Sequence, residues 1–179
     1  MQRKRLAWLL PLAAGLTTVL LGLSSSPASA AFFYANFVHN NTNQCLDLRG
    51  EDSVSVQTWE CVHNQNQAWR LEFVTSGTGG AAVYRVINKR NQRCLGIWAN
   101  SLNVGAPAQV QPCSLSTSTL TQLWYKNGRL SNGSVLSTFV NFYSGYCLDV
   151  RNNDGGNGAI VQQYNCNGSD AQSWRDVNA

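Results

Sequence analysis

The chain carries Cys45-Leu46-Asp47, then Cys61, then Gln67-Ala68-Trp69, and it repeats this order twice more. The second and third copies consist of Cys94-Leu95-Gly96, Cys113 and Gln122-Leu123-Trp124, and of Cys147-Leu148-Asp149, Cys166 and Gln172-Ser173-Trp174. The first cysteines lie 49 and 53 residues apart, and the tryptophans lie 55 and 50 residues apart. One unit of about 50 residues is therefore used three times, which is typical of a repeat architecture.

The first 30 residues have the layout of a secretory signal peptide. Arg3-Lys4-Arg5 precedes an apolar run from Leu6 to Leu23, and Ala28-Ser29-Ala30 offers a small-residue cleavage site. The apolar run is long enough to span a bilayer, so an uncleaved anchor is the alternative. We expect cleavage, secretion and no membrane insertion afterwards. The expected domains are a signal peptide at 1–30 and one folded domain at 31–179, with repeats at about 31–78, 79–128 and 129–179.

Cysteine use in an exported chain favours disulfides over thiol chemistry. All six cysteines fall inside the repeat. Because each unit holds two of them, the repeat selects one pairing, namely Cys45–Cys61, Cys94–Cys113 and Cys147–Cys166. A metal cluster is disfavoured, since the chain lacks Cys-x-x-Cys and its only histidines are His39 and His63. We therefore expect no metal and no cofactor.

The charge balance argues against a polyanionic partner such as nucleic acid. Three of the 13 Lys and Arg residues lie in the first 30 positions, which leaves ten against nine acidic residues, a net charge near +1. The polar residues are mainly Asn, Gln, Ser and Thr, and such a surface suits neutral hydroxylated ligands. Lys89, Arg90 and Arg93 cluster in sequence. They predict a solvated loop, with contact to an anionic group as the alternative.

Short apolar runs separated by Gly, Asn, Asp and Ser predict strands and turns, and no long 3.6-residue period predicts a helix. The expected strands are 45–48, 54–59, 68–73, 83–88, 94–97, 108–111, 139–142, 147–150 and 159–164. Three units of about four short strands can close into a barrel, which removes free sheet edges. Trp69, Trp124 and Trp174 are expected to fill its core, with the preceding Gln amides bonded to buried backbone groups.

The threefold Cys-Leu-Asp, Cys and Gln-x-Trp pattern resembles the ricin-type β-trefoil, the R-type lectin domain, over essentially the whole chain after residue 30. The resemblance implies an all-β β-trefoil with three pseudo-symmetric repeats and one disulfide inside each repeat. It also implies at most one shallow sugar site in each unit.

A site for a neutral sugar needs an aromatic face, a carboxylate that accepts from two hydroxyls, and amides that both donate and accept. At the positions where the resemblance places these groups, the first unit has Asp47, Gln57, Trp59, Asn66 and Gln67. The third unit has Asp149, Gln162, Tyr164 and Gln172, with Ala171 in the Asn position, for which Asn165 or Asn167 is the alternative amide. The second unit has Gly96 for the carboxylate and Gln111 for the aromatic, so we expect it to be structural only.

Taken singly, each Asp is explained by a turn and each aromatic by a surface edge. However, the units that keep the Asp also keep the aromatic, and this joint retention favours function. The sequence therefore predicts a secreted lectin for galactose- or xylose-type sugars, with galactosides, xylan-like chains or other neutral glycans as partners. One alternative is a non-catalytic cell-binding subunit that joins a separate toxin or secreted enzyme subunit. The other is a protein-binding trefoil such as a protease inhibitor. An enzyme is not expected, because few acids and two histidines leave no evident catalytic set.

Overall fold

The computed structural model describes residues 33–114 and 120–179, and these form twelve strands, five short 3-10 turns and no α-helix. The predicted scarcity of helix is confirmed for these residues. In the same part of the chain, no helix has the length and apolarity to cross a bilayer. The signal peptide predicted at 1–30 lies outside the described residues.

Six strands close into a barrel. They are β1 (Ala35–His39), β4 (Trp69–Ser76), β5 (Ala82–Asn88), β8 (Trp124–Ser131), β9 (Ser134–Asn141) and β12 (Trp174–Asn178). Each strand is antiparallel to two neighbours in the ring β1-β4-β5-β8-β9-β12, which closes where β12 pairs with β1. This closure leaves no long unpaired edge in the ring.

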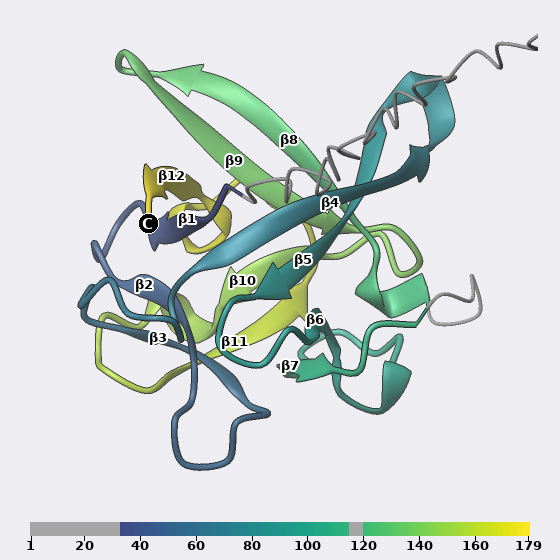
Figure 1. The fold of residues 1–179 in the computed structure, drawn as a ribbon. Helices are drawn as coiled ribbons and strands as arrows, with labels where there is room; N and C mark the ends of the chain where they lie inside the picture. Colours follow the sequence, from purple (N-terminus) through teal and green to yellow (C-terminus); the bar gives the residue numbers. More distant parts are fainter. Residues whose placement is uncertain (1–32, 115–119) are drawn as a thin grey trace, which may run out of the picture. The chain divides into compact units, whose positions relative to one another are not determined.

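The other six strands form three short hairpins, one in each unit. They are β2 (Cys45–Leu48) with β3 (Val56–Trp59), β6 (Cys94–Ile97) with β7 (Ala108–Gln111), and β10 (Cys147–Val150) with β11 (Ala159–Tyr164). The hairpins gather beside one another, away from the far ends of the long barrel strands (Figure 1). β3 pairs with β11, and isolated bridges join Ser55 to Gln109 and Pro107 to Gln162. A six-stranded barrel with three hairpins is a β-trefoil, as the sequence predicted.

The repeated tryptophans lie in the core, as predicted. All three are fully buried, and each indole N–H donates to the backbone carbonyl of the leucine in its own Cys-Leu pair. The pairs are Trp69 with Leu46 at 2.9 Å, Trp124 with Leu95 at 3.0 Å and Trp174 with Leu148 at 3.4 Å. Each tryptophan therefore ties a barrel strand to the hairpin of the same unit, and no indole nitrogen is left unsatisfied.

The disulfides have the predicted pairing, with one bridge inside each unit. Cys45–Cys61, Cys94–Cys113 and Cys147–Cys166 have Cα–Cα distances of 5.1, 5.0 and 5.1 Å. Each bridge ties the start of a hairpin to the segment that follows the same hairpin. On the chain-entropy model, one bridge of this loop length contributes on the order of 3 kcal/mol.

The strand predictions are incomplete for the barrel. β1, β8 and β12 were not among the expected strands, and β9 begins at Ser134 rather than at Phe139. Only Trp124 of the eight residues of β8 is buried and four are exposed, and all eight pair with β9. The overlooked signal is Asn132-Gly133, whose φ angles of 49° and 79° are those of a two-residue type I′ hairpin turn.

Candidate functional site

The first-unit hollow is a surface cavity of about 360 Å³. It is lined by Asp47, Arg49, Gly50, Glu51, Gln57, Trp59, Val62, Asn64, Asn66 and Gly158. Four of the five residues predicted for the first unit therefore meet in one place. The volume is at the small end of the range of about 300–1,000 Å³ for ligand pockets, which fits a monosaccharide better than a large ligand.

The alternation of side chains along β2 and β3 brings Asp47, Gln57 and Trp59 to the same face. Leu46 and Leu48 on β2 point into the core, so Asp47 between them points to the opposite face. Gln57 on β3 lies directly opposite Asp47 in the register, and Trp59 lies two residues further along the same face. Asp47 is buried, whereas Trp59 keeps 38% of its surface exposed. The hollow therefore has a carboxylate at its base and an aromatic side chain at its edge.

A chain of hydrogen bonds orients the amide of Gln57. Arg49 Nε donates to Gln57 Oε1 at 3.0 Å, and Gln57 Nε2 donates to Asp47 Oδ1 at 2.9 Å. The arginine can only donate, so it fixes the Gln57 oxygen on its own side and turns the amide nitrogen toward the carboxylate. A carboxylate has about four lone-pair sites, so Asp47 can still accept bonds from ligand hydroxyls.

Burial raises the pKa of Asp47 above its ordinary value of 3.8. Hydrogen bonds from Gln57 and Gln67 and the charge of Arg90 oppose this effect without cancelling it. The fold thus holds a carboxylate where burial disfavours the charged form. A perturbed carboxylate inside a surface hollow is a marker of functional sites.

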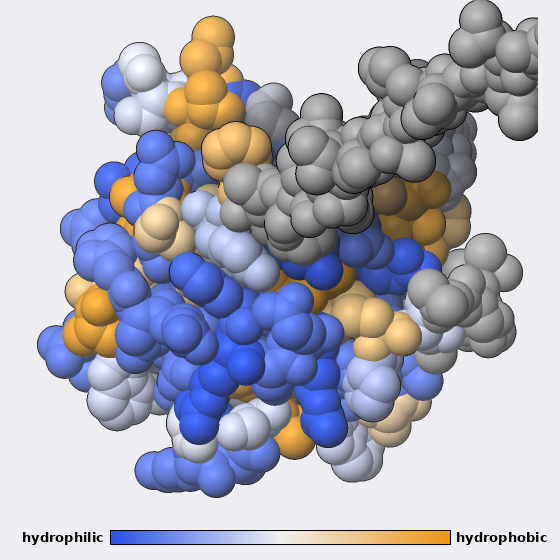
Figure 2. All heavy atoms as spheres, viewed as in Figure 1, coloured by the Kyte–Doolittle hydropathy of each residue, from blue (hydrophilic) through white to orange (hydrophobic). Residues whose placement is uncertain are grey.

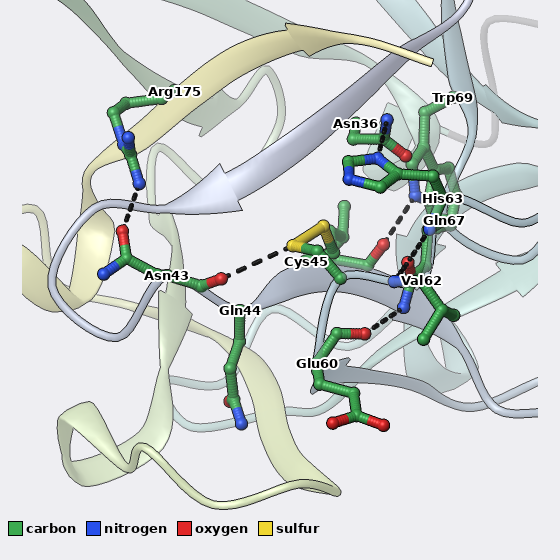
Figure 3. The surroundings of a disulfide bond; sticks show 12 residues. Asn36, Asn43, Gln44, Cys45, Glu60, Val62, His63, Gln67, Trp69 and Arg175 are labelled. Carbon is green, nitrogen blue, oxygen red and sulfur yellow. Dashed lines mark hydrogen bonds between the residues drawn. A yellow bond between two sulfur atoms is a disulfide. The ribbon is translucent and has the colours of Figure 1, made fainter.

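Gln67 lies behind the hollow rather than in its wall. Its side chain is fully buried, Nε2 donates to the Glu60 carbonyl at 2.8 Å, and Oε1 accepts from the backbone N–H groups of Val62 and His63 at 2.8 and 3.0 Å. Figure 3 shows this amide pointing into the segment that follows β3, beside the Cys45–Cys61 bridge. Gln67 therefore shapes the loop from which Val62 and Asn64 line the hollow.

Asn66 is held by the second unit. Arg90 Nη1 donates to Asn66 Oδ1 at 3.0 Å, and Asn88 Nδ2 donates to the Asn66 carbonyl at 2.8 Å. Arg90 belongs to the basic cluster for which the sequence predicted a solvated loop. It is exposed, but it also fixes the orientation of an amide in the first-unit hollow.

The third-unit hollow repeats the first in a cavity of about 300 Å³. It is lined by Asp149, Val150, Asn152, Asn153, Gln162, Tyr164, Asn167, Ser169 and Ala171. Arg151 Nε donates to Gln162 Oε1 at 2.8 Å, and Gln162 Nε2 donates to Asp149 Oδ1 at 2.9 Å. This is the same arginine–glutamine–aspartate chain as in the first unit.

Three further details define the third-unit hollow. Burial raises the pKa of Asp149, opposed by bonds from Gln162 and Gln172 and by the charge of Arg151. Gln172 is buried, and its Nε2 donates to Asp149 Oδ2 at 3.1 Å and to the Asn165 carbonyl at 2.8 Å. Ala171 brings no amide, but Asn167 and Ser169 line the same wall.

The second unit has no comparable arrangement at the matching position. Gln111 Nε2 donates to the Ile97 carbonyl at 2.8 Å, beside Gly96. A Cβ atom on Gly96 would lie 3.2 Å from Gln111 Nε2 and 3.2 Å from Gln122 Cγ. The space that a carboxylate would enter is therefore already filled by glutamine side chains.

The sequence placed Arg49 and Arg151 in segments expected to shape the choice of sugar, but it did not predict that these two arginines and Arg90 orient the amides. Arg49 and Arg151 each come two residues after the aspartate of their unit, and this shared spacing is a signal that the sequence contains. Arg90 is 24 positions away from Asn66, and no sequence signal links the two. Ser169 was not predicted, and Asn167 was expected only as an alternative amide for the position of Ala171.

Comparisons with known proteins agree with the β-trefoil fold. The model of the ricin-type beta-trefoil lectin domain matches residues 82–178, and that of the ricin-type beta-trefoil lectin domain-like family matches residues 28–111. The designed threefold symmetric protein ThreeFoil superposes with a TM-score of 0.69 at 26% identity, covering 82% of this chain and 99% of that chain. A Macrolepiota procera ricin B-like lectin, solved in complex with lactose, superposes with a TM-score of 0.66 at 18% identity, covering 84% of this chain and 99% of that chain.

Among curated proteins, Serine protease 1 of Rarobacter faecitabidus is 23% identical over 151 residues. The match covers 75% of this chain but 29% of that protein, so the chain spans less than a third of the length of this curated relative. The two family models between them span the repeats that build the barrel and both hollows. The chain therefore belongs to the ricin-type beta-trefoil lectin family.

Proposed function

We propose that the protein is a secreted, non-catalytic lectin that binds galactose- or xylose-type residues of neutral glycans in the first-unit and third-unit hollows. One observation carries the proposal. Two separate units build the same arginine–glutamine–aspartate chain beside an exposed aromatic, whereas the second unit, which lacks the aspartate, keeps only the glutamine of that chain, Gln109 opposite Gly96. A structural role alone would not require the second copy, because the second unit folds without it.

The groups in the first-unit hollow match the chemistry of a pyranose ring. Trp59 offers a flat face for the apolar C–H side of the sugar, and Asp47 accepts hydrogen bonds from two adjacent hydroxyls. Asn66 supplies an amide whose oxygen is already bonded to Arg90, so its nitrogen is the group available to a sugar oxygen. The contacts are few and the hollow is shallow, so we expect weak binding of a single sugar.

Gln67 and Gln172 have a different role from the direct sugar contact expected from the sequence. Both side chains are buried, and both bond to the loop behind their hollow. We infer that they support the sites rather than touch the sugar. Gln172 also bonds directly to Asp149, so its replacement is expected to disturb that carboxylate.

Two sites on one rigid body can bind one polymer or one glycan-coated surface together, which raises avidity without any new contact. The third-unit site is expected to be the weaker of the two, because Ala171 replaces the amide that Asn66 provides. Asn167 and Ser169 are the residues that we propose as partial substitutes.

The positions of the histidines support a non-catalytic role. His39 is fully buried, and its Nδ1 pairs with the Thr42 hydroxyl at 2.8 Å. His63 pairs with Asn36 Nδ2 at 3.0 Å and does not line the first-unit hollow. The described residues therefore place no imidazole beside Asp47 or Asp149 to act as a general base.

Sugar binding is expected to weaken on acidification, starting at a higher pH than for an ordinary aspartate. The sugar hydroxyls donate to the ionised carboxylate, and burial raises the pKa of Asp47 and Asp149 above 3.8. Below that raised pKa, the apparent affinity falls by up to about tenfold for each pH unit. Titration calorimetry between pH 8 and pH 4 measures this, with circular dichroism at each pH as the control for unfolding. Affinity that stays constant to pH 4 in a folded protein would contradict the role of the carboxylates.

A glycan array probed with the oxidised protein lacking residues 1–30 tests the proposed function. We expect signals on galactose- or xylose-terminated neutral glycans, and loss of those signals in an Asp47→Asn/Asp149→Asn double variant. An array without signals, together with inhibition in a protease assay, would instead support a protein-binding trefoil. Signals that persist unchanged in the double variant would mean that the sugar binds outside the first-unit and third-unit hollows.

A further inference from the structure

The inter-unit hollow is a second cavity beside the first-unit hollow, with a volume of about 280 Å³. It is lined by Arg49, Val54, Ser55, Val56, Gln57, Trp98, Pro107, Ala108, Gln109 and Ile160, so all three units contribute to it. It lies where the three hairpins meet, next to the bridge between Ser55 and Gln109. Arg49 and Gln57 line both hollows, so the two cavities adjoin the same hydrogen-bonded pair.

Trp98 is the distinctive residue of this hollow. It stands two positions after Gly96, as Arg49 stands after Asp47 and Arg151 after Asp149. In the other two units this position orients the glutamine of a sugar site. In the second unit the arginine and the aspartate are both gone, and a tryptophan with 59% of its surface exposed takes the arginine position.

The backbone holds Trp98 in place. Its N–H donates to the Pro107 carbonyl at 2.9 Å, and its carbonyl accepts from Ser101 N–H at 3.0 Å. Ala99, which follows it, has a φ of 52°, a left-handed conformation that L-residues other than glycine, asparagine and aspartate rarely adopt. Strain of this kind persists only where the surroundings enforce it, and it is concentrated at functional sites. The backbone at Trp98 is therefore fixed, and its exposed side chain lies in the lining of the inter-unit hollow.

The walls of the inter-unit hollow have the mixed character of a sugar site. Trp98 and Ile160 are exposed apolar side chains, while Gln57, Gln109 and Ser55 supply neutral donors and acceptors. Arg49 is the one charged residue in the lining, and its Nε is already bonded to Gln57. Figure 2 shows a face on which hydrophilic residues predominate and apolar residues form only scattered patches, so the surface in this view lacks a broad apolar docking area.

We propose that the inter-unit hollow binds the next residue of a glycan chain whose first sugar occupies the first-unit hollow, with Trp98 as the stacking surface. This inference rests on the proposed function, because it needs a sugar beside Asp47. The second unit then takes part in binding without a site of its own, since its tryptophan extends the site of the first unit. The ligand of the first-unit site is therefore a neutral oligosaccharide rather than an isolated terminal sugar.

Trp98→Ala tests the inference with two matched ligand series, galactose with lactose and β-1,3-galactotetraose, and xylose with xylobiose and xylotetraose. In the wild-type protein, affinity for the preferred series is expected to rise from the monosaccharide to the oligosaccharide. In Trp98→Ala, the affinity for the monosaccharide stays unchanged and the affinity for the oligosaccharide falls by roughly tenfold. Trp98→Tyr, which retains an aromatic face, is expected to restore most of the loss.

Phe73→Ala is the matched control, because Phe73 is an aromatic of similar exposure, 60%, on a barrel strand outside both hollows. A nuclear magnetic resonance titration adds a direct readout. The Trp59 indole signal should shift with the monosaccharide and the oligosaccharide, whereas the Trp98 indole signal should shift with the oligosaccharide only.

The outcomes separate the two proposals. If the wild-type protein binds no member of either series, the proposed function is wrong, and so is the inference that the inter-unit hollow binds the next sugar. If the wild-type protein binds sugars at Trp59 but has equal affinity for short and long ligands, only the inference about the inter-unit hollow is wrong. The same holds if Trp98→Ala has no effect.

Discussion

Asp47→Asn is expected to weaken monosaccharide binding in the first-unit hollow by about 10- to 100-fold and to leave the fold at least as stable. A hydrogen bond to a charged group contributes about 1.5–3 kcal/mol, which sets the size of the loss. Burial raises the pKa of Asp47, so at pH 7 the charged form disfavours the folded state. The neutral amide of asparagine removes the destabilisation caused by the buried charge, and its oxygen can still accept the hydrogen bond from Gln57. Titration calorimetry and thermal denaturation of the same sample measure both quantities.

Asp52→Asn is the matched control, because this aspartate lies in the loop that follows the strand of Asp47 but does not line the hollow. Its carboxylate is exposed and accepts bonds from the backbone N–H groups of Val54 and Ser55 and from the Ser55 hydroxyl, which lower its pKa. Its replacement should leave sugar affinity unchanged and slightly lower stability, the opposite pattern to Asp47→Asn. If Asp47→Asn lowers stability and leaves affinity intact, Asp47 serves the fold and not the sugar.

Trp124→Ala is expected to lower the free energy of unfolding by about 3–5 kcal/mol, the usual cost of truncating a buried aromatic. The side chain is fully buried, and its loss also leaves the Leu95 carbonyl without the indole donor. A domain of this size has a total stability of about 5–15 kcal/mol, so this is a large fraction of it. Urea denaturation followed by circular dichroism measures the change.

The control for this prediction is Trp98→Ala in the same unit, whose exposed side chain should change the unfolding free energy by no more than about 0.5 kcal/mol. Where Trp124→Ala is still folded, its affinity for a monosaccharide should match that of the wild type. If the two variants unfold at the same urea concentration, Trp124 is not the core element described here. If Trp124→Ala binds no monosaccharide while folded, the second unit is more than structural support.

Much of the fold was predictable because three copies of one unit constrain one another. A single Cys-Leu or Gln-x-Trp carries little information, but three at one spacing predict a closed barrel, the disulfide pairing and buried tryptophans. β8 was not predictable from apolar periodicity, since only Trp124 among its eight residues is buried and all eight are paired through the backbone with β9. Its turn residues, Asn132-Gly133, were a usable signal.

The candidate site was predictable at the positions fixed by strand alternation and less so elsewhere. Asp47, Gln57 and Trp59 lie on paired strands, so their spacing in sequence determines which face they share. The bonds of Gln67 to backbone groups of Glu60 and Val62 were expected from the Gln-x-Trp pattern, but its place behind the hollow rather than in the wall was not. The Arg90 contact joins two units and depends on the closed barrel itself.

The central claim is that a threefold fold carries sugar sites in its first and third units and none at the matching position of the second. A nuclear magnetic resonance titration with galactose and with xylose tests it most directly, because it reports each unit separately. We predict shifts around Asp47 and Trp59 and, at higher sugar concentration, around Asp149 and Tyr164, with no shifts around Gly96 and Gln111. Shifts centred on Gly96 and Gln111, or saturation of the protein without shifts at Trp59 and Tyr164, would contradict it.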